Sequence, residues 1–91
     1  MIKKASIRVT GLVQGVNYRY NTQRKGNELG LVGTVRNMPD GSVHIVCEGE
    51  EFAVLGLIEW CKRGPRGAFV QGVHVEWAEP SGGFPGFSIT Y

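Results

Sequence analysis

The sequence has few cysteines and no long apolar run, and each shortage excludes a class of protein. Its two cysteines, Cys47 and Cys61, are separated by thirteen residues. This spacing matches no short metal or dithiol motif, and a disulfide would need the two cysteines close in space and an oxidising compartment, neither of which the sequence suggests. We therefore expect buried free thiols. No apolar run approaches the ~18 residues needed to cross a bilayer, and the first residues alternate instead of forming a signal-peptide core. These features favour a cytoplasmic protein.

Charge of one sign is also scarce. The formal net charge is only +2, and the basic residues come in short pairs such as Lys3-Lys4, Arg24-Lys25 and Lys62-Arg63, so neither nucleic acid nor a membrane is indicated as a partner. The two histidines, His44 and His74, occupy polar positions of expected strands, and a metal site needs more ligands than these. A small-molecule substrate is the better starting hypothesis.

The hydrophobic residues are sufficient for one core. The chain has 91 residues, of which 42% are hydrophobic, and this length predicts a single domain over residues 1–91. Ala5, Ile7 and Val9 alternate with polar residues, a period of two that indicates a strand. The expected elements are a strand over 5–11, a helix over 18–29 ended by Gly30, strands over 32–37 and 42–48 joined by a turn at 38–41, a helix over 50–62, a strand over 73–78, and a short edge strand over 87–91.

The second expected helix is amphipathic. Between Glu50 and Lys62, apolar residues recur at steps of three, with two further apolar positions that widen the stripe, and the acidic start suits the helix dipole. Gly64-Pro65 ends this helix. The positions expected to pack in the core are Phe52, Val54, Leu55, Leu57, Ile58 and Cys61, together with Trp60 and Trp77.

The order of elements predicts an α+β fold. Strand, helix, strand, strand, helix, strand, with a short extra terminal strand, is the ferredoxin-like βαββαβ plan, in which two helices cover one face of an antiparallel sheet. In that plan the first two strands run the same way with the third between them. The loop after the first strand and the end of the second therefore emerge at one sheet edge, so Arg19 and Asn37 can face each other.

The stretch Gly11–Arg19 joins a strand pattern to a helix pattern. Backbone N–H groups at a helix start lack partners, and together with the positive end of the helix dipole they form a site for a phosphate-like anion. Arg19 adds a planar fork of donors beside them. The residues expected to offer backbone donors are Gln14, Gly15, Val16, Asn17, Tyr18 and Arg19.

Three motifs in order resemble the acylphosphatase family: Gly11-x-Val-Gln-Gly-Val-x-Tyr-Arg19, Leu29-Gly-Leu-x-Gly-x-Val-Arg-Asn37, and Asp40-Gly-Ser-Val43. The resemblance covers nearly the whole chain. It implies hydrolysis of acyl phosphates to a carboxylate and inorganic phosphate, without metal or cofactor. By position, Arg19 matches the family's phosphate-binding arginine, Asn37 matches the asparagine that holds the attacking water, and the loop backbone matches the phosphate cradle.

The chain departs from the family pattern at three positions. Asn17 stands where the family often has glycine, and asparagine is the residue besides glycine that best tolerates positive φ, so we expect the loop to close. Tyr18 replaces the more usual phenylalanine, and its hydroxyl should reach solvent or a partner. Gly26 replaces the usual alanine and should weaken the first helix by about 1 kcal/mol.

Other functions on the same fold remain open at this point. One alternative is a non-catalytic phosphate or acyl-phosphate binding module, and another is a domain like that of hydrogenase-maturation carbamoyltransferases. RNA binding through the sheet is less favoured, because the strand over 42–48 lacks the aromatic and glycine RNP1 pattern. The leading hypothesis is a stand-alone, monomeric hydrolase, the acylphosphatase, in which Arg19 and Asn37 are the catalytic residues.

Overall fold

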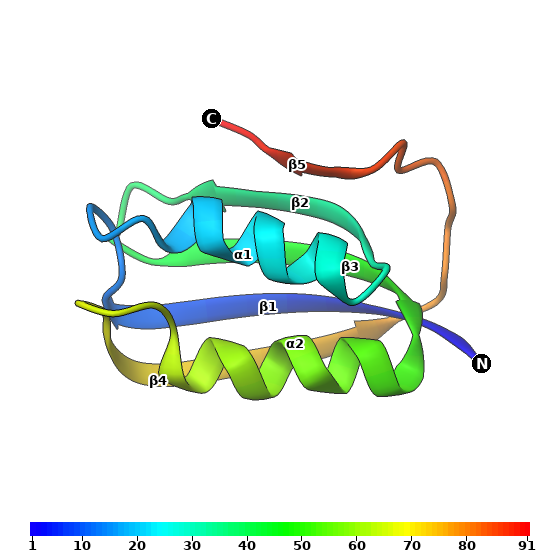
Figure 1. Cartoon of the computed structure of the whole chain (residues 1–91), viewed down its shortest axis with the longest axis horizontal. Helices are drawn as coiled ribbons and strands as arrows, with labels where there is room; N and C mark the ends of the chain where they lie inside the picture. Colours follow the sequence, from blue (N-terminus) through cyan, green and yellow to red (C-terminus); the bar gives the residue numbers. More distant parts are fainter.

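The computed structural model describes residues 1–91 as a five-stranded sheet with two helices on one face (Figure 1). The strand order across the sheet is β4-β1-β3-β2-β5. Neither helix has the length and apolar character needed to span a lipid bilayer. The elements are β1 (Ile2–Leu12), α1 (Tyr18–Glu28), β2 (Val32–Asn37), β3 (Val43–Glu50), α2 (Glu51–Arg63), β4 (Phe69–Ala78) and β5 (Phe87–Ile89).

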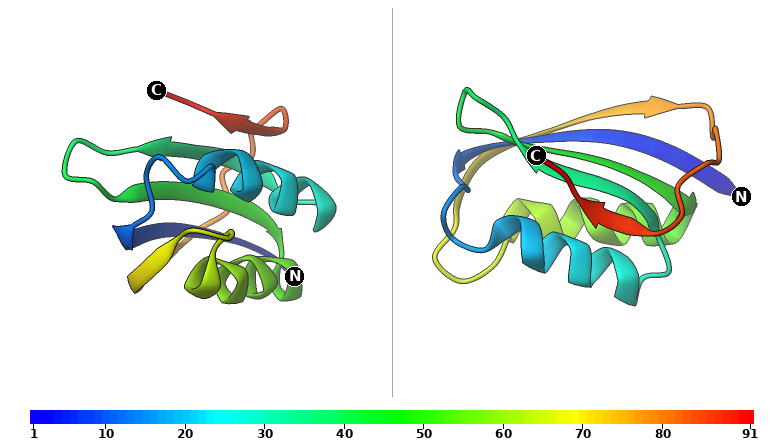
Figure 2. Two further views of the ribbon diagram at one scale, coloured as in Figure 1. Left: turned by 60° about the vertical axis from the view of Figure 1, so that its left-hand side comes forward. Right: turned by 90° about the horizontal axis from the view of Figure 1, so that it is seen from above.

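This arrangement confirms the ferredoxin-like plan and corrects one part of it. Strand β1 pairs antiparallel with β3 and β4, and β2 pairs antiparallel with β3, but β5 pairs parallel with β2. After β4 the chain runs along one end of the sheet to the opposite edge (Figures 1 and 2). Strand β5 therefore returns in the direction opposite to β4, which is also the direction of β2. The sheet is mixed, not wholly antiparallel.

Strand β4 begins at Phe69, four residues earlier than the alternation from Val73 predicts. The reason is a β-bulge in β4 opposite the step from Thr10 to Gly11. Thr10 pairs with Gly72 and Gly11 with Val70, so Gln71 is the extra residue, and the two strands continue to pair beyond it. Gly11 has φ 121°, and a Cβ there would lie 2.2 Å from the carbonyl oxygen of Phe69, so only glycine fits. The bulge interrupts the alternation on which the prediction depended. The other element boundaries differ from the expected ones by at most three residues.

The core fills the space between the sheet and the helices. Each central strand turns alternate residues toward the helices, and Ile7 of β1 and Ile45 of β3 are fully buried. Helix α2 contributes the largest helical share, through residues spaced three and four apart. The core residues of α2 are Ala53, Val54, Leu57, Ile58 and Cys61.

Three residues expected in the core are not there. Phe52 is 75% exposed and Leu55 is 46% exposed, because three residues cover less than one helical turn and a run of threes drifts around the helix. Trp77 lies on the edge strand β4 and is 50% exposed. Trp60, by contrast, packs against the core, with its ring centroid 5.4 Å from that of Tyr18.

Gly26 has a packing role that the sequence did not reveal. It is buried in α1, facing β5, and a Cβ there would lie 2.5 Å from the ring of Phe87. The missing side chain therefore provides the space for Phe87, which is itself buried. Gln23 adds a hydrogen bond between the same two elements, from its Nε2 to the carbonyl oxygen of Phe87 at 2.8 Å. The helix gives up some propensity so that the last strand can pack against it.

The connection from β4 to β5 is held at one end of the sheet by a buried carboxylate. Glu48 of β3 is only 7% exposed. Its two oxygens accept hydrogen bonds from the backbone N–H groups of Ser81, at 2.9 Å, and Gly82, at 3.0 Å. This contact fixes the path of the chain across the sheet end, and hence the edge at which β5 is added.

Candidate active site

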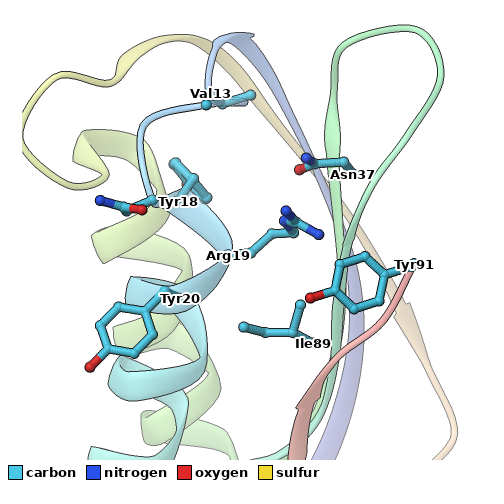
Figure 3. A pocket seen from close by; sticks show the side chains of 9 residues that line it. Val13, Tyr18, Arg19, Tyr20, Asn37, Ile89 and Tyr91 are labelled. Carbon is cyan, nitrogen blue, oxygen red and sulfur yellow. The ribbon is translucent and has the colours of Figure 1, made fainter.

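A pocket of about 210 Å³ lies at the sheet edge where the loop after β1, the start of α1 and the end of β2 meet (Figure 3). The last residue of β5 and the end of the chain form its remaining wall. The lining residues are Val13, Gly15, Asn17, Tyr18, Arg19, Tyr20, Asn37, Ile89 and Tyr91.

The loop between β1 and α1 curls through two residues with left-handed backbone conformations. Gly15 has φ 78°, and Asn17 has φ 62° and ψ 27°, which makes Asn17 the only residue other than glycine with positive φ. The loop thus closes with asparagine, as expected. Asn17 also occupies the N-cap position of α1, but its side chain makes no capping hydrogen bond.

The backbone donors of this loop are free. The N–H groups from Gln14 to Tyr20 donate no hydrogen bond within the chain, and the first turn of α1 contains no acidic residue. A run of free N–H groups at the positive end of a helix dipole attracts an anion. The pocket therefore has an electropositive floor made of backbone.

Arg19 places a positive charge beside these amides. It lies in the first turn of α1, and its guanidinium points between Asn37 and Tyr91 (Figure 3). None of the three ion pairs in the chain involves Arg19. Its charge and its planar set of donors are thus available to a ligand.

Asn37 contributes an unpaired acceptor. It is the last residue of β2, and its Oδ1 is the one buried side-chain polar atom in the chain that lacks a hydrogen-bond partner. A buried acceptor without a donor costs roughly 1–3 kcal/mol, so structures rarely retain one without a reason. A donor that enters the pocket, such as a water molecule, would satisfy this oxygen.

The expected loop residues divide into two groups. Gly15, Asn17, Tyr18 and Arg19 line the pocket, whereas Gln14 and Val16 do not. Val16 packs against the core. The side chain of Gln14 turns instead toward the connection between β2 and β3, where its Nε2 donates to two backbone carbonyls.

The hydroxyl of Tyr18 has a hydrogen-bond partner inside the chain. Tyr18 is only 1% exposed, and its hydroxyl donates to the backbone carbonyl of Cys61 at 2.8 Å. Burial raises the pKa of this phenol well above its usual value. Tyr18 therefore anchors the start of α1 to α2, and its free backbone N–H is the group that it offers to the site.

The thiols of Cys47 and Cys61 are free and buried, as expected. Burial raises the pKa of each thiol to about 12. Both groups are protonated at neutral pH and play no part in the pocket.

Ile89 and Tyr91 are lining residues that the sequence analysis missed. They lie two residues apart, so they project to the same side of the terminal segment. Their place at the pocket follows from the parallel pairing of β5 with β2, which puts this segment beside Asn37. The alternation Phe87, Ile89, Tyr91 was the available signal, but it does not indicate the direction of the strand.

A ferredoxin-like sheet with a loop of free amides, an unpaired arginine and an orphaned carboxamide oxygen at one edge defines a small anion-binding α+β protein. Comparison with known proteins identifies the family within this class. The acylphosphatase family model matches residues 5–89. The chain belongs to the acylphosphatase family, and the acylphosphatase enzyme expected from the motifs is confirmed.

Two relatives match over nearly their full lengths. The acylphosphatase of Anaeromyxobacter dehalogenans is 47% identical over 88 residues, which cover 97% of this chain and 95% of the relative. The crystal structure of acylphosphatase from Bacillus subtilis superposes with a TM-score of 0.94 and 36% identity, and covers 100% of both chains.

The same fold also occurs inside a longer protein. The structure of HypF from T. kodakarensis is 30% identical, with a TM-score of 0.84, but the match covers 98% of this chain and only 12% of that one. The near full-length matches to acylphosphatases are therefore the more informative comparison for the function of this chain.

Proposed function

We propose that the pocket hydrolyses small-molecule acyl phosphates to a carboxylate and inorganic phosphate. In this proposal Arg19 and the loop amides of residues 14–19 bind the phosphate, and Asn37 orients the attacking water. The observation that carries the assignment is the orphaned Oδ1 of Asn37, a buried acceptor beside a positively charged guanidinium (Figure 3). Such an acceptor calls for a donor from outside the chain.

The phosphate group fits the donors that the loop provides. Phosphoryl transfer requires little covalent help from a protein; it requires that the charge on the phosphoryl oxygens is stabilised and that the nucleophile is held in line. The free N–H groups of the loop donate to the phosphoryl oxygens, and the Arg19 guanidinium offers two parallel donors and a full positive charge. These groups are fixed by the fold before the substrate arrives.

The carboxamide of Asn37 positions the nucleophile without titrating. Its Oδ1 accepts one hydrogen of the water, which directs the water oxygen toward phosphorus. The new bond joins the water oxygen to phosphorus, and the bond from phosphorus to the acyl oxygen breaks. The carboxylate leaves with that electron pair and needs no general acid, because it is a weak base. The family resemblance implies that the phosphate itself accepts the proton of the water.

Hydrolysis of benzoyl phosphate by two variants tests these roles. Asn37→Ala should lower kcat about a hundredfold, with inhibition by inorganic phosphate little changed, because the variant loses alignment of the water but keeps the anion site. Arg19→Lys keeps the charge but loses the planar fork, so it should raise the phosphate inhibition constant at least tenfold.

Two matched controls accompany these variants. Asn27→Ala and Arg24→Lys change the same residue types at exposed positions of α1, and both should retain the kinetics of the unmodified chain. If Asn37→Ala keeps its kcat, or Arg19→Lys keeps its phosphate affinity, the corresponding residue does not have the proposed role.

We further propose that residues 1–91 form a single domain that acts as a monomer in the cytoplasm. One cluster of buried residues draws on the sheet and both helices, which supports a single domain. The two unbridged thiols suit a reducing compartment. Sedimentation equilibrium should give the mass of one chain; a dimer mass at micromolar concentration would contradict the proposal.

A further inference from the structure

The side chain of Gln14 makes two hydrogen bonds from one amide nitrogen. Its Nε2 donates to the backbone carbonyl of Met38 at 2.8 Å and to that of Ser42 at 2.9 Å. Both hydrogens of the nitrogen are thereby used. Both acceptors belong to the turn that connects β2 to β3, and the first of them directly follows Asn37.

The turn that receives these bonds is itself well braced. Met38 N–H donates to the Ser42 carbonyl at 2.8 Å, and Gly41 N–H donates to the Met38 carbonyl at 3.1 Å. The carboxylate of Asp40 accepts from both the N–H and the hydroxyl of Ser42, at 3.0 and 2.6 Å. Gln14 therefore holds its loop against a turn of fixed shape.

The sheet does not otherwise join the two sides of the pocket directly. The loop and Arg19 follow β1, whereas Asn37 ends β2, and β3 lies between these strands. No ladder hydrogen bond connects β1 to β2. Besides Gln14, the exposed ion pair between Arg8 and Asp40 is the only side-chain hydrogen bond between β1 or its loop and the turn. Gln14 provides the partly buried connection close to the pocket.

We infer that the side chain of Gln14 is a positioning residue, which sets the separation and angle between the phosphate-binding loop and the Asn37 carboxamide. This inference rests on the proposed function and adds to it a side chain that touches neither phosphate nor water, distinct from the backbone N–H of the same residue that is assigned to the phosphate. In-line attack requires the water and the phosphorus to be aligned, and a misplacement of about 1 Å can cost a hundredfold in rate. The hydrogen bonds of Gln14 prevent that misplacement.

Removal of the side chain gives the primary test. Gln14→Ala should lower kcat for benzoyl phosphate by about ten- to a hundredfold. The inhibition constant of inorganic phosphate should stay within about threefold of its original value, because the loop amides and Arg19 remain. A role in stability alone would not produce this split between kcat and phosphate affinity in a folded variant.

Gln23 offers a matched control. Its Nε2 also donates to a backbone carbonyl at 2.8 Å across two elements, from a partly buried position, but the acceptor is Phe87, away from the loop and the turn. Gln23→Ala should therefore leave kcat within about twofold of the original. Both variants are to be compared at a temperature where circular dichroism shows each of them folded.

A second variant provides a rescue. In Gln14→Glu the donor nitrogen becomes a carboxylate oxygen that faces two carbonyls and has no hydrogen to donate. Protonation restores one O–H donor, so kcat of Gln14→Glu should rise at least tenfold between pH 8 and pH 5, while that of Gln23→Glu should not.

The outcomes separate this inference from the function on which it rests. If Gln14→Ala and Gln23→Ala have equal kcat, or if the loss in Gln14→Ala lies in phosphate affinity with kcat retained, Gln14 is not a positioning residue. The absence of a rescue at low pH also contradicts the inference. If instead Asn37→Ala and Arg19→Lys keep full activity, the proposed site is wrong, whatever Gln14 does.

Discussion

The guanidinium carbon of Arg19 lies 5.0 Å from the centre of the Tyr91 ring. A cation over an aromatic face is attracted by the ring's negative charge density. Tyr91 is almost fully exposed, and this is the one cation–π or aromatic pair that its ring forms. The ring thus holds the arginine beside Asn37 before an anion binds, and reduces the conformational freedom that binding would remove.

Truncation of this aromatic ring should weaken phosphate binding. Tyr91→Ala removes a cation–π contact worth about 0.5–1 kcal/mol at an exposed site, so the phosphate inhibition constant should rise about two- to fivefold. Tyr91→Phe keeps the ring face and should bind as the original does. Tyr20→Ala is the control, because Tyr20 lines the same pocket but its ring points away from Arg19 (Figure 3). Equal affinities in Tyr91→Ala and Tyr20→Ala would exclude this role.

The rate of hydrolysis should depend little on pH. A guanidinium and a carboxamide do not change charge in the physiological range, so kcat for benzoyl phosphate should be nearly constant from about pH 5 to 8. His44 has a lowered pKa because of burial and the nearby Arg36, but it alternates with the core-facing residues of β3 and so lies on the sheet face away from the helices. His44→Gln should give the same flat profile. A limb of the pH–rate profile below pH 6.5 that disappears in His44→Gln would contradict this mechanism.

A pair of glycines in the two helices should respond oppositely to alanine. Gly26→Ala gains about 1 kcal/mol of helix propensity but forces a Cβ to within 2.5 Å of the Phe87 ring, an overpacking that costs about 1–3 kcal/mol. In urea denaturation, the free energy of unfolding of Gly26→Ala should be lower by about 1 kcal/mol. In Gly56→Ala the new methyl meets Leu29 at an ordinary 3.6 Å, and the free energy of unfolding should rise by up to ~1 kcal/mol. A stabilised Gly26→Ala would mean that Phe87 can move aside.

Acid should loosen the turn that carries Asp40. The hydrogen bonds from Ser42, followed by that from Arg8, lower the pKa of the Asp40 carboxyl to about 2. A lowered carboxyl pKa stabilises the folded state above the unfolded value near 3.9, and this contribution is lost as the pH falls toward 2. The free energy of unfolding should therefore fall less steeply between pH 4 and 2 in Asp40→Asn. Glu79→Gln changes an exposed carboxylate outside the three ion pairs. The free energy of unfolding of this variant should fall between pH 4 and 2 as steeply as that of the original chain.

The sequence was sufficient to predict the fold class and to bring Arg19 and Asn37 to one place. Alternation, the glycine-rich loop and the order of elements each have a local physical cause, and the topology then places the two residues at the same sheet edge. Both residues do line one pocket. The positive φ of Asn17 was also predictable, since few other residues tolerate it.

The features that the sequence did not predict depend on contacts between distant segments. The direction of β5 is set by the path of the chain around the sheet end, which Glu48 fixes through Ser81 and Gly82. Without that direction, neither Tyr91 at the pocket nor the Phe87 ring against Gly26 could be foreseen. The exposure of Phe52 has a different cause, because a strict step of three is not the period of an α-helix.

The central position of β3 has a consequence for how activity first appears when the chain refolds. Residues of the loop and Asn37 are neighbours in space only after β1 and β2 have each paired with β3. Such non-local pairing forms late relative to isolated helices. After dilution from denaturant, catalytic activity should therefore recover later than the circular dichroism signal of the helices. The time at which activity returns then reports when β1, β3 and β2 have all paired.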